Sequence, residues 1–422
     1  MKRAQLQDIK RTGAEKLLAA LPMPGHEGAA EAGWAREARA KARARFLEAG
    51  APVKRDEYWK YTDPTALTSP LSVVGEAPAG PVEMLADAAM ARFVNGRFLA
   101  DQSTVPDGVA LIPLSDALYQ DLGIARTLFG VLEEAGQEKV ARPLAALNTA
   151  CATEGLVLQA TGTATLHLAQ DHGGEGVSLL HHLIRVETGA ELTLIETGCS
   201  SNTVMEVDLA EGASFHHIRV QEGTREASAT HLFARLGAEA AFKSFTLTAD
   251  GAMTRNEVVI EFTGNDAQGH IAGAVLGRET SHIDNTVFVT HGAEQCESRQ
   301  VFKNVLSDRS AAVFQGKIFV REGAQKTDGY QISQAVLLTD GAEFLVKPEL
   351  EIYADDVACS HGSTTGALDE TSLFYLRARG VPLKDAEAML VAAFVDEAIA
   401  EIAEDDLADA MRAHVARWMD AR

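Results

Sequence analysis

The chain has 422 residues, of which 46% are hydrophobic and 23% charged, the balance of a globular protein large enough to bury a core without disulfides. Sixty acidic against 38 basic residues give a net charge of −22, which argues against nucleic acid or an anionic membrane as the main partner. No apolar run reaches the roughly 18–20 residues that span a bilayer, and the charged first residues lack a secretory signal. We therefore expect a cytoplasmic protein that binds neither nucleic acid nor membrane.

The first 150 residues are expected to form a helical region with a small mixed α/β segment. The segment 27–50 is rich in Ala, Glu, Arg and Leu and ends at Gly50, a residue type that commonly terminates helices. A Pro- and Gly-rich stretch at 73–83 indicates a linker. Beyond it, Asn95-Gly96 between short apolar runs predicts a two-residue β-hairpin, and residues 124–150 return to helical composition.

From Cys151 to residue 368 the composition changes from helix-forming residues to short segments rich in Val, Ile, Leu, Thr and Phe, which alternate with predicted turns. Pairs of Gly and Ala punctuate this region at irregular intervals. An irregular period of about 20–25 residues favours a β-solenoid, whose coils stack to bury one continuous core, because a β-sandwich repeats about every 8–12 residues. The glycines of these pairs are Gly189, Gly212, Gly237, Gly251, Gly273, Gly292, Gly323 and Gly341.

Residues 369–422 are expected to form a C-terminal helical region. Asp369 suits the N-cap of a helix of about ten residues, Gly380 its end, and Pro382 the start of a second helix. One apolar row would dock the second helix on its own protein, so two rows indicate that it also buries a face against something else. The rows are Leu383, Ala386, Leu390, Phe394, Ala398 and Ile402, and beside them Val391, Val395 and Ile399.

The sequence lacks nucleotide-binding motifs, and neither its two histidine doublets nor five of its single histidines show metal-ligand spacing. The only Gly-Lys pair, Gly316-Lys317, is not part of a phosphate-binding loop. Adjacent strand residues point to opposite faces, so a histidine doublet cannot offer both rings to one metal, and we expect one ring inward and hydrogen-bonded and one outward. The doublets are His181-His182 and His216-His217; the single histidines interpreted as structural are His167, His172, His270, His282 and His291.

One short segment could carry metal chemistry. Cys359 lies two residues before His361, so both side chains project from one face if the segment continues the strand that starts near Leu350. A thiolate and an imidazole suit iron or zinc, and Asp355, further back on that face, could orient the ring. Two ligands do not hold a metal alone, so the site would need a partner chain; the alternative is a buried structural thiol beside a capping histidine. All four cysteines are scattered and are expected to be free thiols, namely Cys151, Cys199, Cys296 and Cys359.

Several segments together resemble a known family: Trp59–Thr62, Ala145–Ala150, Thr327–Ser333, Leu337-Leu338, Lys347–Val357, Cys359–Gly362, Leu373–Gly380 and Ala386–Ile399. They are similar to the SufD branch of the SufB/SufD family, subunits of the Suf scaffold for iron–sulfur cluster assembly. The resemblance is dense over about 290–400 and looser before 150. The SufB branch carries a cysteine before a Gly-Ala step in the penultimate coil, where this chain has Asp340, and the missing cysteine favours the SufD branch.

The resemblance implies a right-handed parallel β-helix over 151–368, flanked by the two helical regions. It implies a non-catalytic scaffold subunit that pairs with SufB through the β-helices and binds the SufC ATPase through its C-terminal helical region. His361, with Cys359 as the weaker candidate, would ligate a transient iron–sulfur cluster at the SufB interface, and the isolated chain would hold no tightly bound cofactor. Without SufB, the shared fold predicts a homodimer through the same surface.

Two other functions stay open. A cytosolic β-helix enzyme acting on a carbohydrate-like substrate is the main alternative, although such enzymes usually need secretion and a basic or carboxylate-lined groove. A self-contained metalloprotein is the other. Metal analysis after anaerobic purification, of the chain alone and with SufB and SufC, separates the three, because the scaffold predicts little metal in the isolated chain.

Overall fold

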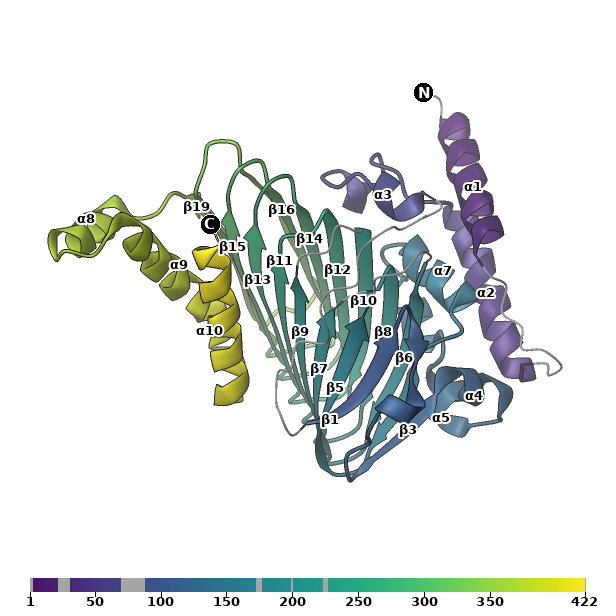
Figure 1. Cartoon of the computed structure of the whole chain (residues 1–422). Helices are drawn as coiled ribbons and strands as arrows, with labels where there is room; N and C mark the ends of the chain where they lie inside the picture. The colour runs from purple at the N-terminus through teal and green to yellow at the C-terminus, as the bar shows by residue number, and fades with distance from the viewer. Residues whose placement is uncertain are drawn as a thin grey trace.

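The computed structural model describes residues 3–21, 31–69, 88–171, 177–198, 200–222 and 227–421. The linker predicted at 73–83, His172 and Cys199 lie outside these residues. Two β-sheets form the centre of the molecule, and helices from the two ends of the chain lie on opposite sides of them (Figure 1). This arrangement confirms the mainly β fold with helical ends.

The chain alternates between two sheets and so forms a parallel β-solenoid. The nine-stranded sheet contains β3 (Val109–Pro113), β4 (Leu156–Ala160), β6 (Leu179–Val186), β8 (Asn202–Leu209), β10 (Ala227–Leu236), β12 (Met253–Phe262), β14 (His282–His291), β16 (Ala311–Val320) and β18 (Glu343–Ile352). The ten-stranded sheet contains β2 (Arg97–Phe98), β1 (Ala89–Val94), β5 (Thr163–Asp171), β7 (Glu191–Gly198), β9 (Ser214–Glu222), β11 (Ala241–Ala249), β13 (Gln268–Gly277), β15 (Glu297–Leu306), β17 (Asp328–Leu337) and β19 (Ala358–Gly366). From β4 to β19 each coil adds one strand to each sheet, in parallel with the previous coil.

The later coils are longer than the predicted period. In an early coil Leu179 pairs with Asn202, a separation that agrees with the prediction, but in a late coil Ala311 pairs with Glu343, which lies well beyond it. The predicted period was too short because the Gly-Ala pairs do not mark one repeated turn. Each coil has two corners, the turns at which the chain passes from one sheet to the other and back. The Gly-Ala pairs occur at both kinds of corner, and Gly273 lies inside β13.

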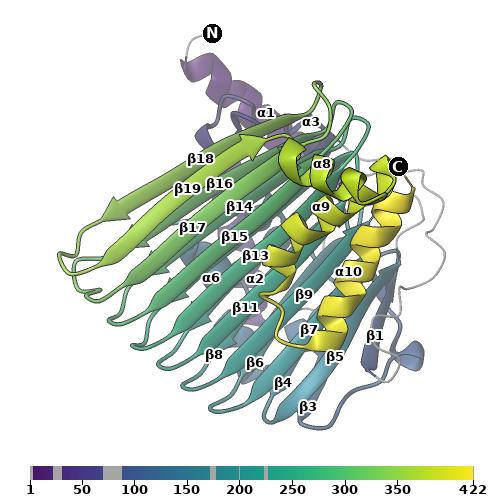
Figure 2. The same ribbon diagram turned by 90° about the vertical axis from the view of Figure 1, so that its left-hand side faces the viewer.

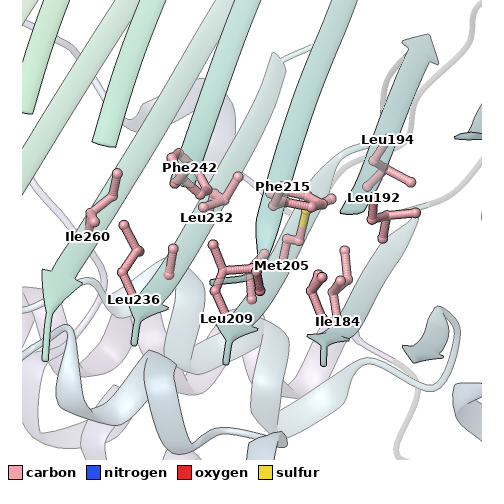
Figure 3. Packing of buried hydrophobic residues seen from close by; sticks show 14 of the residues in the cluster. Ile184, Leu192, Leu194, Met205, Leu209, Phe215, Leu232, Leu236, Phe242 and Ile260 are labelled. Carbon is pink, nitrogen blue, oxygen red and sulfur yellow. The ribbon is translucent and has the colours of Figure 1, made fainter. Parts of the chain in front are cut away.

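An apolar core runs between the two sheets. Alternate residues of each strand point inward, and Figure 3 shows leucine, isoleucine, methionine and phenylalanine side chains of neighbouring coils packed against one another. The rings of Phe215 and Phe242, on adjacent coils, have centroids 5.8 Å apart. The coils therefore share one core, and each coil depends on its neighbours for burial.

A buried ionic cluster also lies between the sheets. Glu196 Oε2 is 3.1 Å from His217 Nε2 and 3.6 Å from Arg219 Nε. Burial raises the pKa of Glu196, but the charge of Arg219 and the hydrogen bond from His217 outweigh it and hold that pKa at about 2. Arg219 also donates a 2.9 Å hydrogen bond to Asn256 Oδ1 on the opposite sheet. The cluster thus links the two sheets through the interior.

Each histidine doublet has one ring on each face of its strand, as predicted, but all four rings are buried. The inward ring is hydrogen-bonded, as predicted, in His217; in the first doublet this prediction is wrong, because the outward His181 has the hydrogen bond and the inward His182 has none among the described residues. His181 and His182 have no exposed surface; His181 Nε2 lies 2.8 Å from Glu206 Oε1, whereas neither nitrogen of His182 has a partner among the described residues. His216 forms an ion pair with Glu404 of the C-terminal region. Helices distant in sequence cover the outer faces of both sheets.

The N-terminal region contains α1 (Arg3–Ala20), α2 (Gly33–Ala49), η1 (Glu57–Trp59), α3 (Thr65–Thr68), η2 (Ala100–Gln102), α4 (Leu114–Tyr119), α5 (Gly123–Leu128), α6 (Val131–Ala135) and α7 (Pro143–Cys151). Gly50 follows α2 at φ +69°, as predicted, and its N–H donates to the carbonyl of Phe46. The predicted hairpin joins β1 to β2, with Asn95 and Gly96 at φ +50° and +74°. β1 and β3 extend the two sheets of the solenoid by pairing with β5 and β4.

The C-terminal region contains α8 (Glu370–Ala378), α9 (Leu383–Ile399) and α10 (Asp405–Asp420). The Asp369 carboxylate accepts a 2.7 Å hydrogen bond from the Ser372 N–H, which confirms the predicted N-cap of α8. Helices α9 and α10 lie across the ten-stranded sheet (Figure 2) and bury their apolar faces against it.

Both apolar rows of α9 contribute to this packing, so the second row does not leave a separate free face on this helix. Val391 and Val395 have no exposed surface, and they pack in the same cluster as Ile218 and Phe245 of the sheet. Exposed apolar side chains occur instead on α8 and the first half of α9. These are Phe374, Tyr375, Leu383 and Met389, which we call the α8–α9 patch.

Candidate functional site

The solenoid has an open end, formed by β18 and β19. Each of these strands pairs with only one neighbour, β16 and β17 respectively, and Figure 2 shows them together at one margin of the sheets. An edge strand offers unpaired backbone N–H and C=O groups to another strand. Apolar surface accompanies this edge, since Ile352 is 38% exposed and Tyr353 59%. This end is therefore suited to pair with another chain.

Cys359 and His361 lie on β19 and share one face, as predicted. The register places Cys359 beside Gly329 and His361 beside Gln331 of β17. Residues paired in parallel strands point the same way, and Gln331 is completely buried between the sheets, so this is the inner face of the solenoid. Two residues along a strand separate Cα atoms by about 7 Å.

The Cys359 side chain packs against apolar residues. It packs with Ile318, Leu350 and Val357, and its Sγ is 3.2 Å from the position that a Cβ on Gly329 would occupy. Burial raises the pKa of Cys359, opposed by a backbone hydrogen bond from Gly329. The side chain is therefore a protonated thiol at neutral pH, and it becomes a strong ligand only when a metal displaces the proton.

His361 is exposed at the edge of the sheet, and its ring has no hydrogen bond within the described part of the chain. Asp355, predicted to orient that ring, lies elsewhere. Strand β18 ends at Ile352, and Asp355 is in the turn that leads to the other sheet. The alternation that placed Asp355 on the face of His361 does not apply across this turn.

Cys359 and His361 are two donors without a third. Across the residues that the structure describes, no three His, Cys, Asp or Glu side chains are grouped so that they could hold a metal ion. Cys151, Cys296 and Cys359 are free thiols, as predicted. A metal held by this pair would need further ligands from outside the described residues. Separately, none of the described helices is long and apolar enough to cross a membrane.

Sequence reasoning missed the residues beneath the site. Gly329 and Gln331 belong to the segment Thr327–Ser333, which was matched to the family without a role for either residue. Each lies one coil before its partner on β19 and on the same face. A correct coil length was the signal that could have found them.

The segment Glu57–Thr62, which we call the aromatic motif, contacts the outer side of the last coil. The Tyr58 hydroxyl donates a 2.7 Å hydrogen bond to Glu349, and Lys347 forms a 2.8 Å ion pair with Glu57. The Lys347 ammonium also lies 4.1 Å from the centroid of the Tyr58 ring. Burial, together with the bond to Glu349, raises the pKa of Tyr58. The N-terminal region therefore braces β18 at the open end.

Residues 167–394 match the core domain of the SufB and SufD proteins of the SUF system for FeS cluster assembly. The chain belongs to the SufB/SufD family. It is 30% identical to the iron-sulfur cluster assembly protein SufD of Escherichia coli, over 88% of this chain and 90% of that protein. An iron-sulfur cluster assembly SufBD family protein of Synechocystis is 28% identical over 83% of this chain and 84% of its own, and SufD of Bacillus subtilis is 26% identical over 55% of each. The chain is thus a SufD-type member with a role in iron–sulfur cluster assembly.

Proposed function

We propose that this chain is the non-catalytic scaffold subunit of a cytoplasmic SufB–SufC–SufD complex, and that it presents His361, with Cys359 as the weaker ligand, to a transient cluster at the SufB interface. The observation that carries the proposal is an incomplete ligand pair on the inner face of an edge strand, at an open solenoid end. A homologous solenoid that continues the sheets here brings its own side chains to the same face. Imidazole and thiolate both ligate iron–sulfur clusters.

The test of the ligand role uses the complex with SufB and SufC, reconstituted anaerobically with iron and sulfide. We expect His361→Ala to leave assembly of the complex intact, because an exposed edge imidazole contributes little burial, and to abolish the cluster absorbance. Cys359→Ser has a smaller effect. Ser363→Ala is the matched control, since Ser363 is the next exposed residue on the same face of β19.

Equal cluster yields from His361→Ala and Ser363→Ala contradict the ligand role. The cluster is cargo in this proposal, so metal analysis of the isolated chain is the complementary measurement. Iron retained by the isolated chain in stoichiometric amounts contradicts a site that needs SufB for completion.

We assign SufC binding to the α8–α9 patch. Its side chains are unusually exposed for apolar groups, with Phe374 at 75% and Met389 at 53%. Phe374→Ser and Met389→Ser are expected to weaken SufC binding at least about tenfold, equivalent to about 1.4 kcal/mol, by calorimetry. Asp406→Ser, an exposed change on α10, is the control. Unchanged affinity in both patch variants contradicts the assignment.

Without SufB, we propose that two copies of this chain pair through the open end. The edge strands and the exposed Ile352 and Tyr353 are the surface that such pairing covers. Screening limits the repulsion between two chains of net charge −22, because charges more than about 8 Å apart interact weakly at physiological ionic strength. Light scattering that gives a monomer at micromolar concentration refutes the dimer.

The alternative of a carbohydrate-acting enzyme predicted a groove lined by basic or carboxylate side chains. A cavity of about 240 Å³ lies beside α1 and α7, and its described lining consists of leucine, alanine, valine, serine and asparagine. This lining supplies no titratable pair for acid–base catalysis. The cavity therefore gives the enzyme alternative no support.

A further inference from the structure

The glutamine beneath His361 has no partner for its amide. Gln331 is completely buried, and neither its Nε2 nor its Oε1 has a hydrogen bond among the described residues. A carboxamide offers two donors and two acceptor lone pairs, and burying them unpaired costs free energy. Both atoms of this amide are therefore available to a group that approaches from β19.

The opposite sheet leaves room for this amide. A Cβ on Gly316 of β16 would lie 2.5 Å from the Cδ, Nε2 and Oε1 atoms of Gln331. The φ of Gly316 does not call for glycine, so the small residue is needed for space and not for backbone conformation. The chain thus accommodates the Gln331 amide between the sheets, one strand in from the strand that carries His361.

We propose that Gln331 is the positioning residue of His361, an inference that rests on the proposed ligand role of His361. In the structure the two side chains are not hydrogen-bonded; rotation of the exposed His361 ring would bring its N–H to the Gln331 Oε1 on the neighbouring strand, which would accept the hydrogen bond. The other ring nitrogen then keeps its lone pair and is directed to the iron at the interface. A hydrogen bond to one imidazole nitrogen fixes the tautomer and the ring orientation of a metal ligand.

The chain contains a matched control for this inference. Gln300 precedes Gln331 in the register by one coil, is equally buried, and also has both amide atoms unpartnered among the described residues. Gln300 lies two strands from His361 and cannot reach it as a neighbour. A merely structural role for buried glutamines predicts equal effects at both positions, whereas positioning of His361 predicts an effect at Gln331 alone.

The first measurement is ¹⁵N NMR of the histidine rings in the full chain, with the His361 signal assigned by its loss in His361→Ala. We expect one tautomer of His361 in the wild type and in Gln331→Glu, which keeps an acceptor. Gln331→Met, which keeps the length and removes the amide, is expected to give a mixture of tautomers. Gln300→Met leaves the wild-type signal. An unchanged tautomer in Gln331→Met, or the same mixture in Gln300→Met, overturns the proposal.

The second measurement is the cluster yield of the reconstituted complex with SufB and SufC. Gln331→Met is expected to lower the apparent affinity for the cluster about 10- to 100-fold, the usual effect of losing a partner of a metal ligand. Gln300→Met stays within about twofold of the wild type. If His361→Ala retains the cluster, the ligand role fails, while the NMR result still decides whether Gln331 orients the ring. Equal affinities in Gln331→Met and Gln300→Met overturn the positioning role.

Discussion

Truncation after Gly380 removes α9 and α10, and we expect it to destabilise the solenoid itself. Nine large apolar side chains of this segment are at most 6% exposed, namely Val391, Val395, Ile399, Ile402, Leu407, Met411, Val415, Trp418 and Met419. At about 1.5–3 kcal/mol for each buried side chain, their gross burial is worth roughly 15–25 kcal/mol. If only half of it is against the sheet, the loss of roughly 7–12 kcal/mol is comparable with the whole stability of a domain, about 5–15 kcal/mol.

The truncated chain also exposes the sheet side of this interface, including Ile218 and Phe245. We expect binding of a hydrophobic dye, aggregation at micromolar concentration and a lower midpoint of urea unfolding by circular dichroism. The double variant Phe374→Ser/Met389→Ser is the control, because both side chains are exposed and its midpoint should match the wild type. A truncated chain that stays monodisperse with an unchanged midpoint refutes the reasoning, and shows that the coils stack without this cover.

Three further changes have defined outcomes. The folded pKa of Glu196, about 2, lies below its ordinary value of 4.5, so the ionised carboxylate adds about 3 kcal/mol to the stability at neutral pH, which is lost as the pH falls from about 4.5 to 2. Glu196→Gln should therefore lower the urea midpoint at pH 7 and flatten the change of that midpoint between pH 5 and pH 3. A pH profile equal to that of the wild type contradicts this. The Trp59 side chain is 5% exposed, and its ring centroid lies 4.1 Å from the Arg255 guanidinium. Trp59→Ala should therefore lower the free energy of urea unfolding by about 3–5 kcal/mol. A loss below about 1 kcal/mol means that Trp59 is not part of the core. Asp369→Ala should destabilise α8 locally, seen as severalfold faster amide exchange in that helix without a shift of the global midpoint.

Local signals predicted local structure well in this chain. The ends of α2 and α8 follow from Gly50 and Asp369, because capping satisfies backbone groups within one helical turn. The hairpin follows from Asn95-Gly96, because both residues tolerate the positive φ that the turn needs. The shared face of Cys359 and His361 follows from strand alternation alone.

Features that depend on distant contacts were not predictable in the same way. His216 is paired with Glu404 of the C-terminal region, and no local sequence pattern predicts this contact. The second apolar row of α9 predicted a surface for another protein, but the row packs against the ten-stranded sheet. The sequence pattern of the helix does not show how wide that sheet is. Predicting that Gln331 lies beside His361 requires the number of residues in a coil. The Gly-Ala pairs did not give this number, because they occur at both kinds of turn.

The contacts of Glu57 and Tyr58 with Lys347 and Glu349 also set an order of events during synthesis. These partners are separated by 290 and 291 residues. At about 5–20 residues per second, a ribosome releases β18 roughly 15–60 s after the aromatic motif. During this time each new coil is the temporary edge of the growing sheets, and the motif has no completed surface on which to dock. The nascent chain is therefore exposed to mispairing and to chaperones until its last coil has emerged, and the attachment of the N-terminal motif to β18 is a late step of folding.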